Sequence, residues 1–350
     1  MSRIIELLEA AVKNEASDLH VTVGSPPVFR ITGDLRISKE MAFSAQDTEA
    51  MLRELLSSDQ WTQLLLHGEI DFSYSLPGVS RFRMNAYRQR GCYSLAVRMV
   101  PTIIPAFDRL GLPSMVRTFA DRQQGLVLVT GPTGSGKTTT LAALINYINQ
   151  TQQRHIITLE DPIEYLHRHG HSVIDQREVG VDTMSFAKGL RAALRQDPDV
   201  LLVGEMRDLE TIATAITAAE TGHLVFATLH TSDAPQSIDR MIDVFPPQQQ
   251  QQIRIQLASV LQGIVSQRLI PTADGSSRVA AVEILVNTPA IANLIRSEKI
   301  HQIKTMLQTG KMHGMQTMEM SLRDLVQSKH ITETQVRQLA SEWVGGLTVL

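Results

Sequence analysis

The chain has 350 residues, 43% of them hydrophobic and 20% charged, which is typical of a folded protein with room for two domains. Its 33 Lys and Arg residues against 36 Asp and Glu residues give a formal charge of −3, which offers no general attraction to nucleic acid. The single cysteine, Cys92, excludes a disulfide framework and a zinc site built from several thiolates, and it favours a reducing compartment. No apolar run reaches about 18 residues, and acids interrupt the first apolar stretch, so we expect neither a membrane span nor a signal peptide.

Residues 1–100 are predicted to form an N-terminal α+β domain. In its second half, apolar and polar side chains alternate on both sides of a turn at Pro77 and Gly78, as in strands with one buried face. The expected elements are helices over 3–16 and 44–67 and strands over 19–23, 28–31, 70–76, 82–86 and 93–100. Because the strands cluster and helices flank them, we expect an antiparallel sheet covered by helices.

A linker is expected over residues 101–113, which contain three prolines and a glycine. From residue 114 to 350, short apolar runs alternate with helical patterns, which indicates an α/β domain built on a parallel sheet. Strands are expected over 126–129, 156–159, 200–203 and 224–229, with helices over 139–145 and 183–196, before Gly222, and from Pro247 through Ile264. The region from about 279 to 350 is expected to be mainly helical.

One segment of this second domain fits the phosphate-loop pattern G-x-x-x-x-G-K-[ST] at every fixed position, between a buried strand and a helix. It reads Gly131, Pro132, Thr133, Gly134, Ser135, Gly136, Lys137 and Thr138, and Thr139 continues into the helix. The glycines let backbone N–H groups and the helix N-terminus point at phosphate oxygens. Lys137 can reach the β- and γ-phosphates, and the Thr138 hydroxyl can bind Mg²⁺. The chain is therefore predicted to bind a nucleoside triphosphate.

A nucleotide hydrolase also needs an acidic group that holds the Mg²⁺ shell or orients the attacking water. Glu205 follows the expected strand 200–203, and Glu160 follows the strand 156–159, with Asp161 and Glu164 after it. In a parallel sheet these strand ends lie at the edge that carries the phosphate loop. Glu205 and Glu160 are therefore candidate catalytic residues. The residues alone leave open which of them activates water; we favour Glu205, which we also assign to the metal shell.

Two histidines, His223 and His230, bracket the expected strand 224–229. Their separation and the lack of a cysteine pair argue against metal binding, whereas His230 at the carboxyl end is positioned to sense the γ-phosphate. The arginines of the N-terminal strands are Arg81, Arg83, Arg88, Arg90 and Arg98. Most are expected on a solvated face, but one supplied to a neighbouring subunit's nucleotide would act as an arginine finger. Arg83 and Arg98 are the first candidates.

Four segments resemble, in order, the Walker A, Asp, Walker B and His boxes of the secretion ATPases. They are residues 131–138, 157–165, 190–208 and 221–231. The start of the chain, Ser17-Asp18-Leu19-His20 with Pro26-Pro27, is similar to the opening of the PilT family, the type IV pilus retraction ATPases. Residues 290–295 resemble that family's C-terminal motif but carry Ala292 where an arginine is usual. The resemblance covers nearly the whole chain.

This resemblance implies a PAS-like N-terminal domain, a RecA-like P-loop ATPase domain, and ATP with Mg²⁺ as ligands. It implies a homohexameric ring that docks to an inner-membrane pilus platform protein and retracts the pilus in twitching motility. The chain would then be cytoplasmic and peripheral to the inner face of the cytoplasmic membrane. By the same resemblance Glu205 is the Walker B glutamate, and Glu160 belongs to the Asp box.

Other functions stay open. An assembly ATPase for pilus extension or type II secretion would carry a longer N-terminal region and a four-cysteine zinc module, which we do not expect here. An accessory retraction paralogue is harder to separate. A RecA-like nucleic-acid motor has no support from a basic tail, a helix-turn-helix or an aromatic and basic strand face, so no nucleic-acid partner is expected. A non-catalytic, nucleotide-gated adaptor would differ by its lack of turnover.

Overall fold

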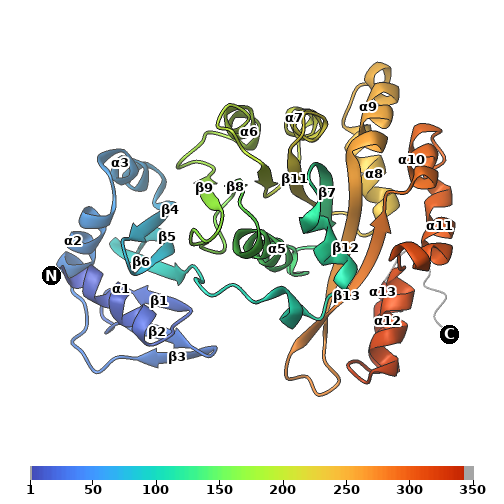
Figure 1. The fold of residues 1–350 in the computed structure, drawn as a ribbon. Helices are drawn as coiled ribbons and strands as arrows, with labels where there is room; N and C mark the ends of the chain where they lie inside the picture. Colours follow the sequence, from blue (N-terminus) through green and yellow to red (C-terminus); the bar gives the residue numbers. More distant parts are fainter. Residues whose placement is uncertain (1, 343–350) are drawn as a thin grey trace. The chain divides into compact units, whose positions relative to one another are not determined.

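The computed structural model describes residues 2–342, and these divide into two compact units (Figure 1). The first unit holds the residues up to Ile103 together with Glu164–Leu166. The second holds Ile104–Ile163 and the residues from His167 onward. No helix among the described residues is long and apolar enough to cross a membrane.

The first unit is an antiparallel sheet with three helices, which confirms the predicted α+β character. The strands lie in the order β3-β2-β1-β6-β5-β4. Its elements are α1 (Arg3–Lys13), β1 (Asp18–Val21), β2 (Val28–Ile31), β3 (Asp34–Ile37), α2 (Ala45–Leu55), α3 (Ser58–His67), β4 (Glu69–Leu76), β5 (Ser80–Gln89) and β6 (Cys92–Met99).

Alternation along the long strands decides which face of this first sheet is buried. On β5, Phe82, Met84 and Ala86 are buried, while the residues between them are partly exposed. They join one hydrophobic cluster with Ile4 and Leu8 of α1. Successive strand residues point to opposite sides, so the other face of the sheet carries the polar positions, Arg83 among them.

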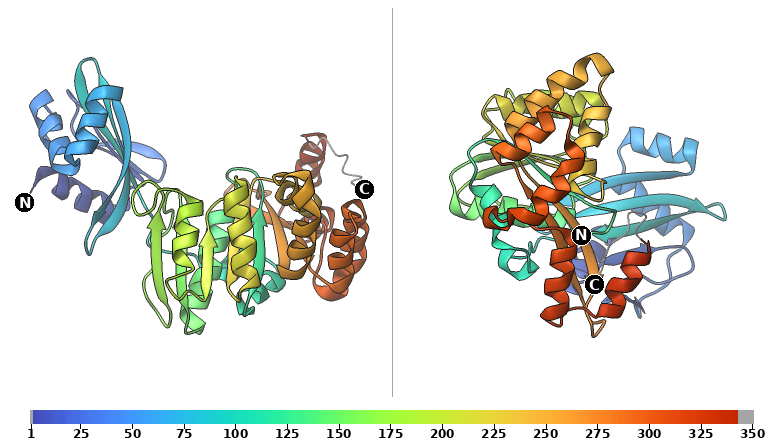
Figure 2. Two further views of the ribbon diagram at one scale, coloured as in Figure 1. Left: turned by 90° about the horizontal axis from the view of Figure 1, so that it is seen from above. Right: turned by 90° about the vertical axis from the view of Figure 1, so that its right-hand side faces the viewer.

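The second unit is a seven-stranded sheet in the order β13-β12-β7-β11-β10-β8-β9, with helices packed on it (Figures 1 and 2). Every neighbouring pair is parallel except β12 and β13. Its strands are β7 (Gly125–Thr130), β8 (His155–Glu160), β9 (Val173–Glu178), β10 (Val200–Val203), β11 (Leu224–Leu229), β12 (Leu261–Pro271) and β13 (Arg278–Val286). The helices that matter below are α5 (Lys137–Thr151), α6 (Phe186–Ala193), α7 (Leu209–Glu220), α8 (Ala234–Asp243), α9 (Pro247–Val260), α10 (Pro289–Arg296), α11 (Ile303–Thr309) and α12 (Met318–Gln327). Shorter helical segments are η1 (Phe107–Leu110), α4 (Ser114–Thr118), η2 (Phe119–Asp121), η3 (Ile300–Gln302) and η4 (Gly310–His313), and α13 (Glu333–Glu342) ends the described chain.

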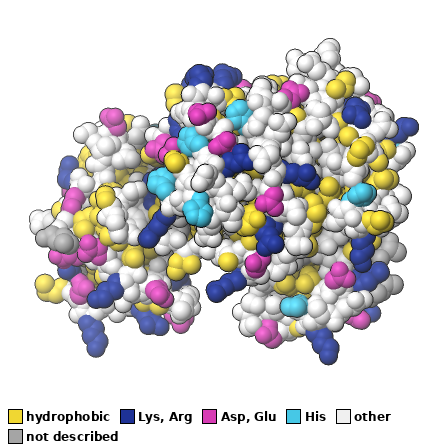
Figure 3. All heavy atoms as spheres, viewed as in Figure 1, with side chains coloured by type: hydrophobic (Ala, Val, Ile, Leu, Met, Phe, Trp, Pro, Cys, Tyr) yellow, Lys and Arg dark blue, Asp and Glu magenta, His cyan; other side chains and the backbone are white. Residues whose placement is uncertain are grey.

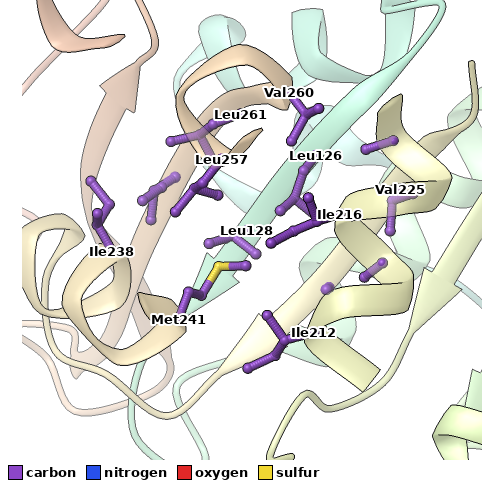
Figure 4. Close-up of a cluster of buried hydrophobic side chains, with 14 of the residues drawn as sticks. Leu126, Leu128, Ile212, Ile216, Val225, Ile238, Met241, Leu257, Val260 and Leu261 are labelled. Carbon is purple, nitrogen blue, oxygen red and sulfur yellow. The ribbon is translucent and has the colours of Figure 1, made fainter. Parts of the chain in front are cut away.

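Both faces of this sheet are covered, so its central strands β7, β10 and β11 are buried along their whole length. One cluster joins the sheet to α7, α8 and α9; part of it is drawn in Figure 4, where Leu126 and Leu128 of β7 lie among side chains of those helices. A second cluster packs α5 against the other face. Each fully buried leucine contributes about 1.5–3 kcal/mol, so these clusters hold the central strand ends in fixed positions.

The expectation of a mainly helical region from 279 onward is wrong at its start, because residues 278–286 form strand β13. Helix α9 also ends at Val260, so Leu261 and Ile264 belong to β12 rather than to the predicted helix. The two strands pair over nine residues, and β12 also pairs with β7. Gly263 permits this change of structure, since a Cβ there would lie 2.2 Å from the Phe119 ring. Tertiary pairing therefore overrides the local helical pattern.

Smaller differences concern element ends and short strands. The single helix expected over 44–67 is two helices, because Ser57 starts α3 with a capping box that Gln60 completes. The helix expected over 183–196 spans only residues 186–193. Strands β3 and β9 were not anticipated; β3 is exposed at every position and carries no burial pattern.

Candidate nucleotide-binding site

The parallel sheet brings most of the predicted site residues to one edge. Strands β7, β11, β10 and β8 are consecutive neighbours, and their carboxyl ends therefore lie side by side. The phosphate loop follows β7, and His230 follows β11. Glu205 lies two residues beyond β10, and Glu160 is the last residue of β8. Lysine, histidine and two carboxylates thus come together from four separate segments.

The conformation of the phosphate loop depends on its glycines. Gly131, Gly134 and Gly136 have φ values of 143°, 78° and 87°, in the region that side chains disfavour. A Cβ at Gly131 would lie 2.3 Å from the carbonyl oxygen of Gln267 in β12, and one at Gly136 would lie 2.8 Å from the Gln267 Nε2. The loop therefore wraps tightly against β12 and enters α5 at Lys137.

Lys137 is held inside this loop rather than extended into solvent. Its Nζ donates to the carbonyl oxygens of Gly131, at 2.8 Å, and Pro132, at 3.0 Å, and the residue is only 8% exposed. Burial lowers the pKa of the ammonium, and the nearby charge of Glu205 acts in the opposite direction. The lysine and this carboxylate therefore share one electrostatic environment.

The other loop side chains differ in exposure. The Ser135 hydroxyl is buried and has no hydrogen-bond partner in the described structure. Thr133 and Thr138 are exposed, and Thr139 is half-buried. A buried hydroxyl without a partner beside a lysine is a donor available to a phosphate oxygen, since burying such a group unpaired costs about 1–3 kcal/mol.

Glu205 lies at the centre of the charged groups of this edge. Its Oε1 is 2.9 Å from the Nε2 of His230 and also pairs with the Nε of Arg207. The hydrogen bond from Arg207, followed by the charges of Glu205 and Asp161, raises the pKa of the Arg207 guanidinium. The carboxylate is 20% exposed and His230 is 44% exposed, so both are accessible to a ligand at the edge.

Glu160 is more enclosed. It is 7% exposed, and its Oε1 accepts hydrogen bonds from Thr158 Oγ1 at 2.7 Å and from Gln176 Nε2 at 3.0 Å. These two donors occupy Oε1 of Glu160 and hold the carboxylate in a fixed orientation inside the protein. Between the two acids, Glu205 is the one whose charge acts on Lys137.

Two residues of this site were missed by the sequence reasoning. Gln267, 3% exposed, accepts a hydrogen bond from Thr140 Oγ1 at 2.8 Å and lies against both ends of the phosphate loop. It is distant in sequence and lies in a segment predicted to follow a helix, so no local signal marks it. Arg207 lies two residues after Glu205 in the sequence, and an arginine this close behind a strand-end acid was the available signal.

The two candidate arginines lie in the first unit and are not part of this edge of the sheet. Arg83 on β5 and Arg98 on β6 are direct cross-strand partners. Arg83 Nη1 donates to Glu164 Oε1 at 3.0 Å, and Arg98 Nε donates to Asp18 Oδ1 at 2.9 Å. Arg83 and Glu164 are 41% and 46% exposed and form a surface ion pair, whereas Arg98 is 68% exposed but its partner Asp18 only 13%.

The donor set at the edge fits Mg²⁺ bound together with a triphosphate. No group of three or more His, Cys, Asp or Glu side chains among residues 2–342 forms a metal cage of its own. Mg²⁺ usually takes only one or two protein oxygens and completes its shell with phosphate oxygens and water. The Thr138 hydroxyl and the Glu205 carboxylate are oxygens of this kind.

The chain is similar to known proteins over almost its whole length. The family model described as "Type II/IV secretion system protein" matches residues 2–344. The chain is 46% identical to the type IV pilus retraction ATPase PilT of Pseudomonas aeruginosa, covering 96% of this chain and 98% of that protein. It is 48% identical to a twitching motility protein of Neisseria gonorrhoeae, covering 90% and 84%. A crystal structure of the pilus retraction motor PilT with bound ADP superimposes with a TM-score of 0.87 at 49% identity, covering 96% of both chains.

Proposed function

The chain belongs to the type II/IV secretion system protein family, and we propose that it is an ATPase motor that retracts a type IV pilus. The observation that carries the proposal is a phosphate loop at the same sheet edge as Glu205 and His230, whose Oε1 and Nε2 atoms are 2.9 Å apart. The chain that holds this site is similar to retraction ATPases over almost its entire length. The ATPase fold is RecA-like, and the nucleotide is ATP. We further infer that residues 1–100 form a PAS-like domain, 101–113 a linker and 114–350 the ATPase domain.

Binding of the triphosphate falls to the loop residues 131–139. Backbone N–H groups at the start of α5 and the helix dipole attract phosphate oxygens. Lys137, already desolvated within the loop, places a fixed positive charge there, and its interaction with phosphate is stronger than it would be in water. The Ser135 hydroxyl supplies a further donor.

Hydrolysis requires a water molecule held in line with the γ-phosphate and a group that accepts its proton. We assign the second task to Glu205, because its side chain is more exposed than that of Glu160 and its charge acts on Lys137. His230 Nε2 contacts the same carboxylate, so this histidine can report to Glu205 whether the γ-phosphate is present. Glu160 would then orient the water or the outer shell of the metal through its buried hydrogen bonds.

Thr138 and Glu205 would hold Mg²⁺, which when bound neutralises charge on the β- and γ-phosphates. The rest of the work is done by the side chains of this protein, which exclude water and fix the orientation of the nucleotide. The buried strands β7, β10 and β11 keep these side chains in place.

The working assembly is proposed to be a homohexameric ring in which arginines of one N-terminal unit face the nucleotide of a neighbour. Arg83 and Arg98 lie opposite each other on one sheet face, and two like charges in that arrangement favour an anion between them. The pair of Arg83 with Glu164 is exposed on both sides and worth about 0–1 kcal/mol, so its exchange for phosphate costs little. Arg98 is exposed, but its partner Asp18 is only 13% exposed.

The mechanical output requires a partner outside the chain. We propose that the ring docks to the inner-membrane platform protein of the pilus, so that the chain is cytoplasmic and reaches the membrane only through that partner. The segment 290–295 in α10 is the candidate contact.

The alternatives predict different behaviour. A nucleic-acid motor is disfavoured because, on the face drawn in Figure 3, basic and acidic side chains are interspersed rather than gathered in one basic patch. Stimulation of turnover by DNA would favour that function. A nucleotide-gated adaptor would bind ATP without turnover.

Deletion of the gene, scored for surface pili and twitching, tests the proposed function directly. A retraction motor predicts excess pili and no movement. Loss of pili would indicate an assembly ATPase. Normal twitching that fails only when a second retraction ATPase is weakened would indicate an accessory paralogue.

A further inference from the structure

Glu283 is a buried carboxylate that the mechanism above does not use. It lies on β13, is 7% exposed, and its Oε1 accepts a hydrogen bond from the backbone N–H of Ala234 at 2.8 Å. A buried charged group is costly unless it is well paired, so a hydrocarbon side chain would be the ordinary choice at this buried strand position. The position of Glu283 between two functional segments suggests what the carboxylate does.

The first segment is the one that carries His230. Ala234 is the first residue of α8 and follows His230 by only four positions. In the first turn of α8, Asp233 accepts the N–H of Gln236, Pro235 has no N–H, and Glu283 accepts the N–H of Ala234. The carboxylate of a distant strand therefore completes the N-terminal cap of the helix that begins just after the sensing histidine, and the helix dipole favours its negative charge.

The second segment is the C-terminal helical region. On either side of Glu283, the backbone of β13 is held by this region. The N–H of Val282 donates to Ser321 Oγ at 3.0 Å, and Ile284 exchanges backbone hydrogen bonds with Gln316. Strand β13 ends at Val286, three residues before α10 begins. A displacement of β13 would therefore be passed to α10 and α12 directly.

A third contact relates Glu283 to the phosphate loop. Its cross-strand partner is Ser266 on β12, and Ser266 Oγ lies 2.9 Å from Thr130 Oγ1. Thr130 is the residue immediately before Gly131. Glu283, Ser266 and Thr130 thus form one row across the sheet next to the nucleotide site.

We propose that Glu283 is a positioning residue that ties the loop carrying His230 to β13, and thereby couples nucleotide turnover to the C-terminal helices. The coupling rests on the proposed ATPase function. In its charged form the carboxylate holds the start of α8 firmly; when it is protonated or replaced by an amide, this hold weakens, and both the geometry of His230 and the response of α10 change.

The charge on Glu283 is adjustable near neutral pH. Burial is the main cause that raises the pKa of Glu283 to about 7, the charges of Asp233 on the α8 cap and Glu319 on α12 add to this effect, and Lys304 on α11 opposes it. Lys304 Nζ and Glu319 Oε1 are 3.8 Å apart, with side chains 58% and 28% exposed, so either can be changed without disturbing the core.

The test measures the pH dependence of ATP turnover in the full-length protein. Wild type should show an inflection near pH 7, with turnover about fivefold higher above it. A hydrogen bond to a charged acceptor is stronger than one to a neutral acceptor by a free energy that corresponds to roughly fivefold in an equilibrium constant. Glu283→Gln should remove this inflection and keep the low turnover of the acidic side at every pH. Its KM for ATP should be unchanged, because Glu283 does not touch the phosphate loop.

Two further variants separate positioning from a purely structural role. Glu319→Gln removes a negative charge and should move the inflection to lower pH, whereas Lys304→Gln removes a positive charge and should move it to higher pH. These opposite shifts are expected even if Glu283→Gln does not fold. Hydrogen exchange of residues 288–299, compared with and without a non-hydrolysable ATP analogue, measures the coupling. The exchange rate should change on nucleotide binding in wild type and stay unchanged in Glu283→Gln.

The possible failures are distinguishable. If wild type does not hydrolyse ATP at any pH, the proposed function fails and this inference fails with it. If wild type hydrolyses ATP but the inflection stays in place in both charge variants, or α10 responds to nucleotide equally in Glu283→Gln, the inference alone is overturned.

A pH-dependent loss of stability is a separate expectation. Burial raises the folded-state pKa of Glu283 from 4.5 to about 7, so the charged form costs global stability even though it makes the stronger local bond to Ala234. The free energy of unfolding should therefore fall as pH rises from about 4.5 toward 7, and denaturant unfolding of Glu283→Gln should show that this slope is gone.

Discussion

Lys137 is the side chain on which nucleotide binding depends most strongly. Its ammonium is buried in the loop and compensates phosphate charge where water cannot. We expect Lys137→Ala to lower ATP turnover by about a hundredfold or more while the protein stays folded, in keeping with loss of a preorganised charge. Turnover assays with circular dichroism as the folding control measure this. Unchanged turnover would show that the assignment of the nucleotide site to this phosphate loop is wrong.

The two acids should separate by their effects on chemistry and on binding. Glu205→Gln keeps the size of the side chain but removes the charge that accepts the proton of water, so turnover should fall by roughly two orders of magnitude with ATP affinity retained. Glu160→Gln is the matched control, since it loses the same charge at the neighbouring strand end. If Glu160→Gln damages turnover more, the assignment of the base to Glu205 is wrong.

At the scale of single residues, the sequence predicted those parts of the site that have a fixed pattern. The phosphate loop needs glycine at defined spacings, and an acid at the end of a buried strand is visible without coordinates. Gln267 was not predictable, because it acts through close contact with Gly131 and Gly136 across a sheet pairing. Glu283 was hidden for the same reason. Their partners are set by topology and not by neighbours in the chain.

At the scale of elements, strands with buried runs were predicted well and paired strands near the end of the chain were not. Leu126–Val129 and Leu224–Leu229 read clearly as strands because every residue is apolar or small. In contrast, β12 follows α9 without a turn residue between them. A residue-by-residue pattern cannot show that pairing with β7 and β13 will end the helix at Val260.

Helix α10 should be separable from hydrolysis. Ile291, Ala292 and Ile295 are buried against the core, whereas Ala290 and Asn293 are exposed. Ala290→Glu adds a charge in the first turn, where the helix dipole favours it, so folding and ATPase activity should be retained. If α10 is the docking segment, pilus retraction in cells should be lost.

The control for this variant is Leu294→Glu, which places a charge on a side chain that packs against the core. We expect it to lower stability and activity together, measured by thermal unfolding and turnover. Loss of ATPase activity in folded Ala290→Glu would count against a separate docking role for α10.

At the scale of the molecule, the division into an α+β unit and a parallel-sheet unit was visible in the change of pattern near residue 100. The structure shows a boundary between residues 103 and 104, with Glu164–Leu166 grouped with the first unit. No periodicity reveals that the short segment 164–166 belongs there. The pairing of Arg83 with Glu164 was equally unpredictable, because it depends on that grouping.

The arrangement of subunits gives the last prediction. If arginines of one N-terminal unit complete a neighbour's nucleotide site, Lys137→Ala and Arg83→Ala should each be inactive alone but recover activity when mixed. The first protein keeps its arginines and the second keeps its phosphate loop, so in an equal mixture about a quarter of the sites in a cyclic ring combine both intact parts. The same experiment applies to Arg98→Ala and to variants of Arg81, Arg88 and Arg90.

Arg53→Ala is the matched control for this experiment. Arg53 also makes an exposed ion pair, with Glu49 at 2.8 Å, but it lies on helix α2 and not in the strands of the sheet. It should be active alone, which shows that loss of a surface arginine does not by itself abolish turnover. Arg90 lies in the turn between β5 and β6, not in a strand as expected, and the other four arginines lie on these two strands. Absence of recovery for all five arginines, with mixed rings demonstrated by mass spectrometry, would overturn the shared site. Recovery confined to Arg83 or Arg98 would identify the guanidinium that neutralises the charge developing on the γ-phosphate.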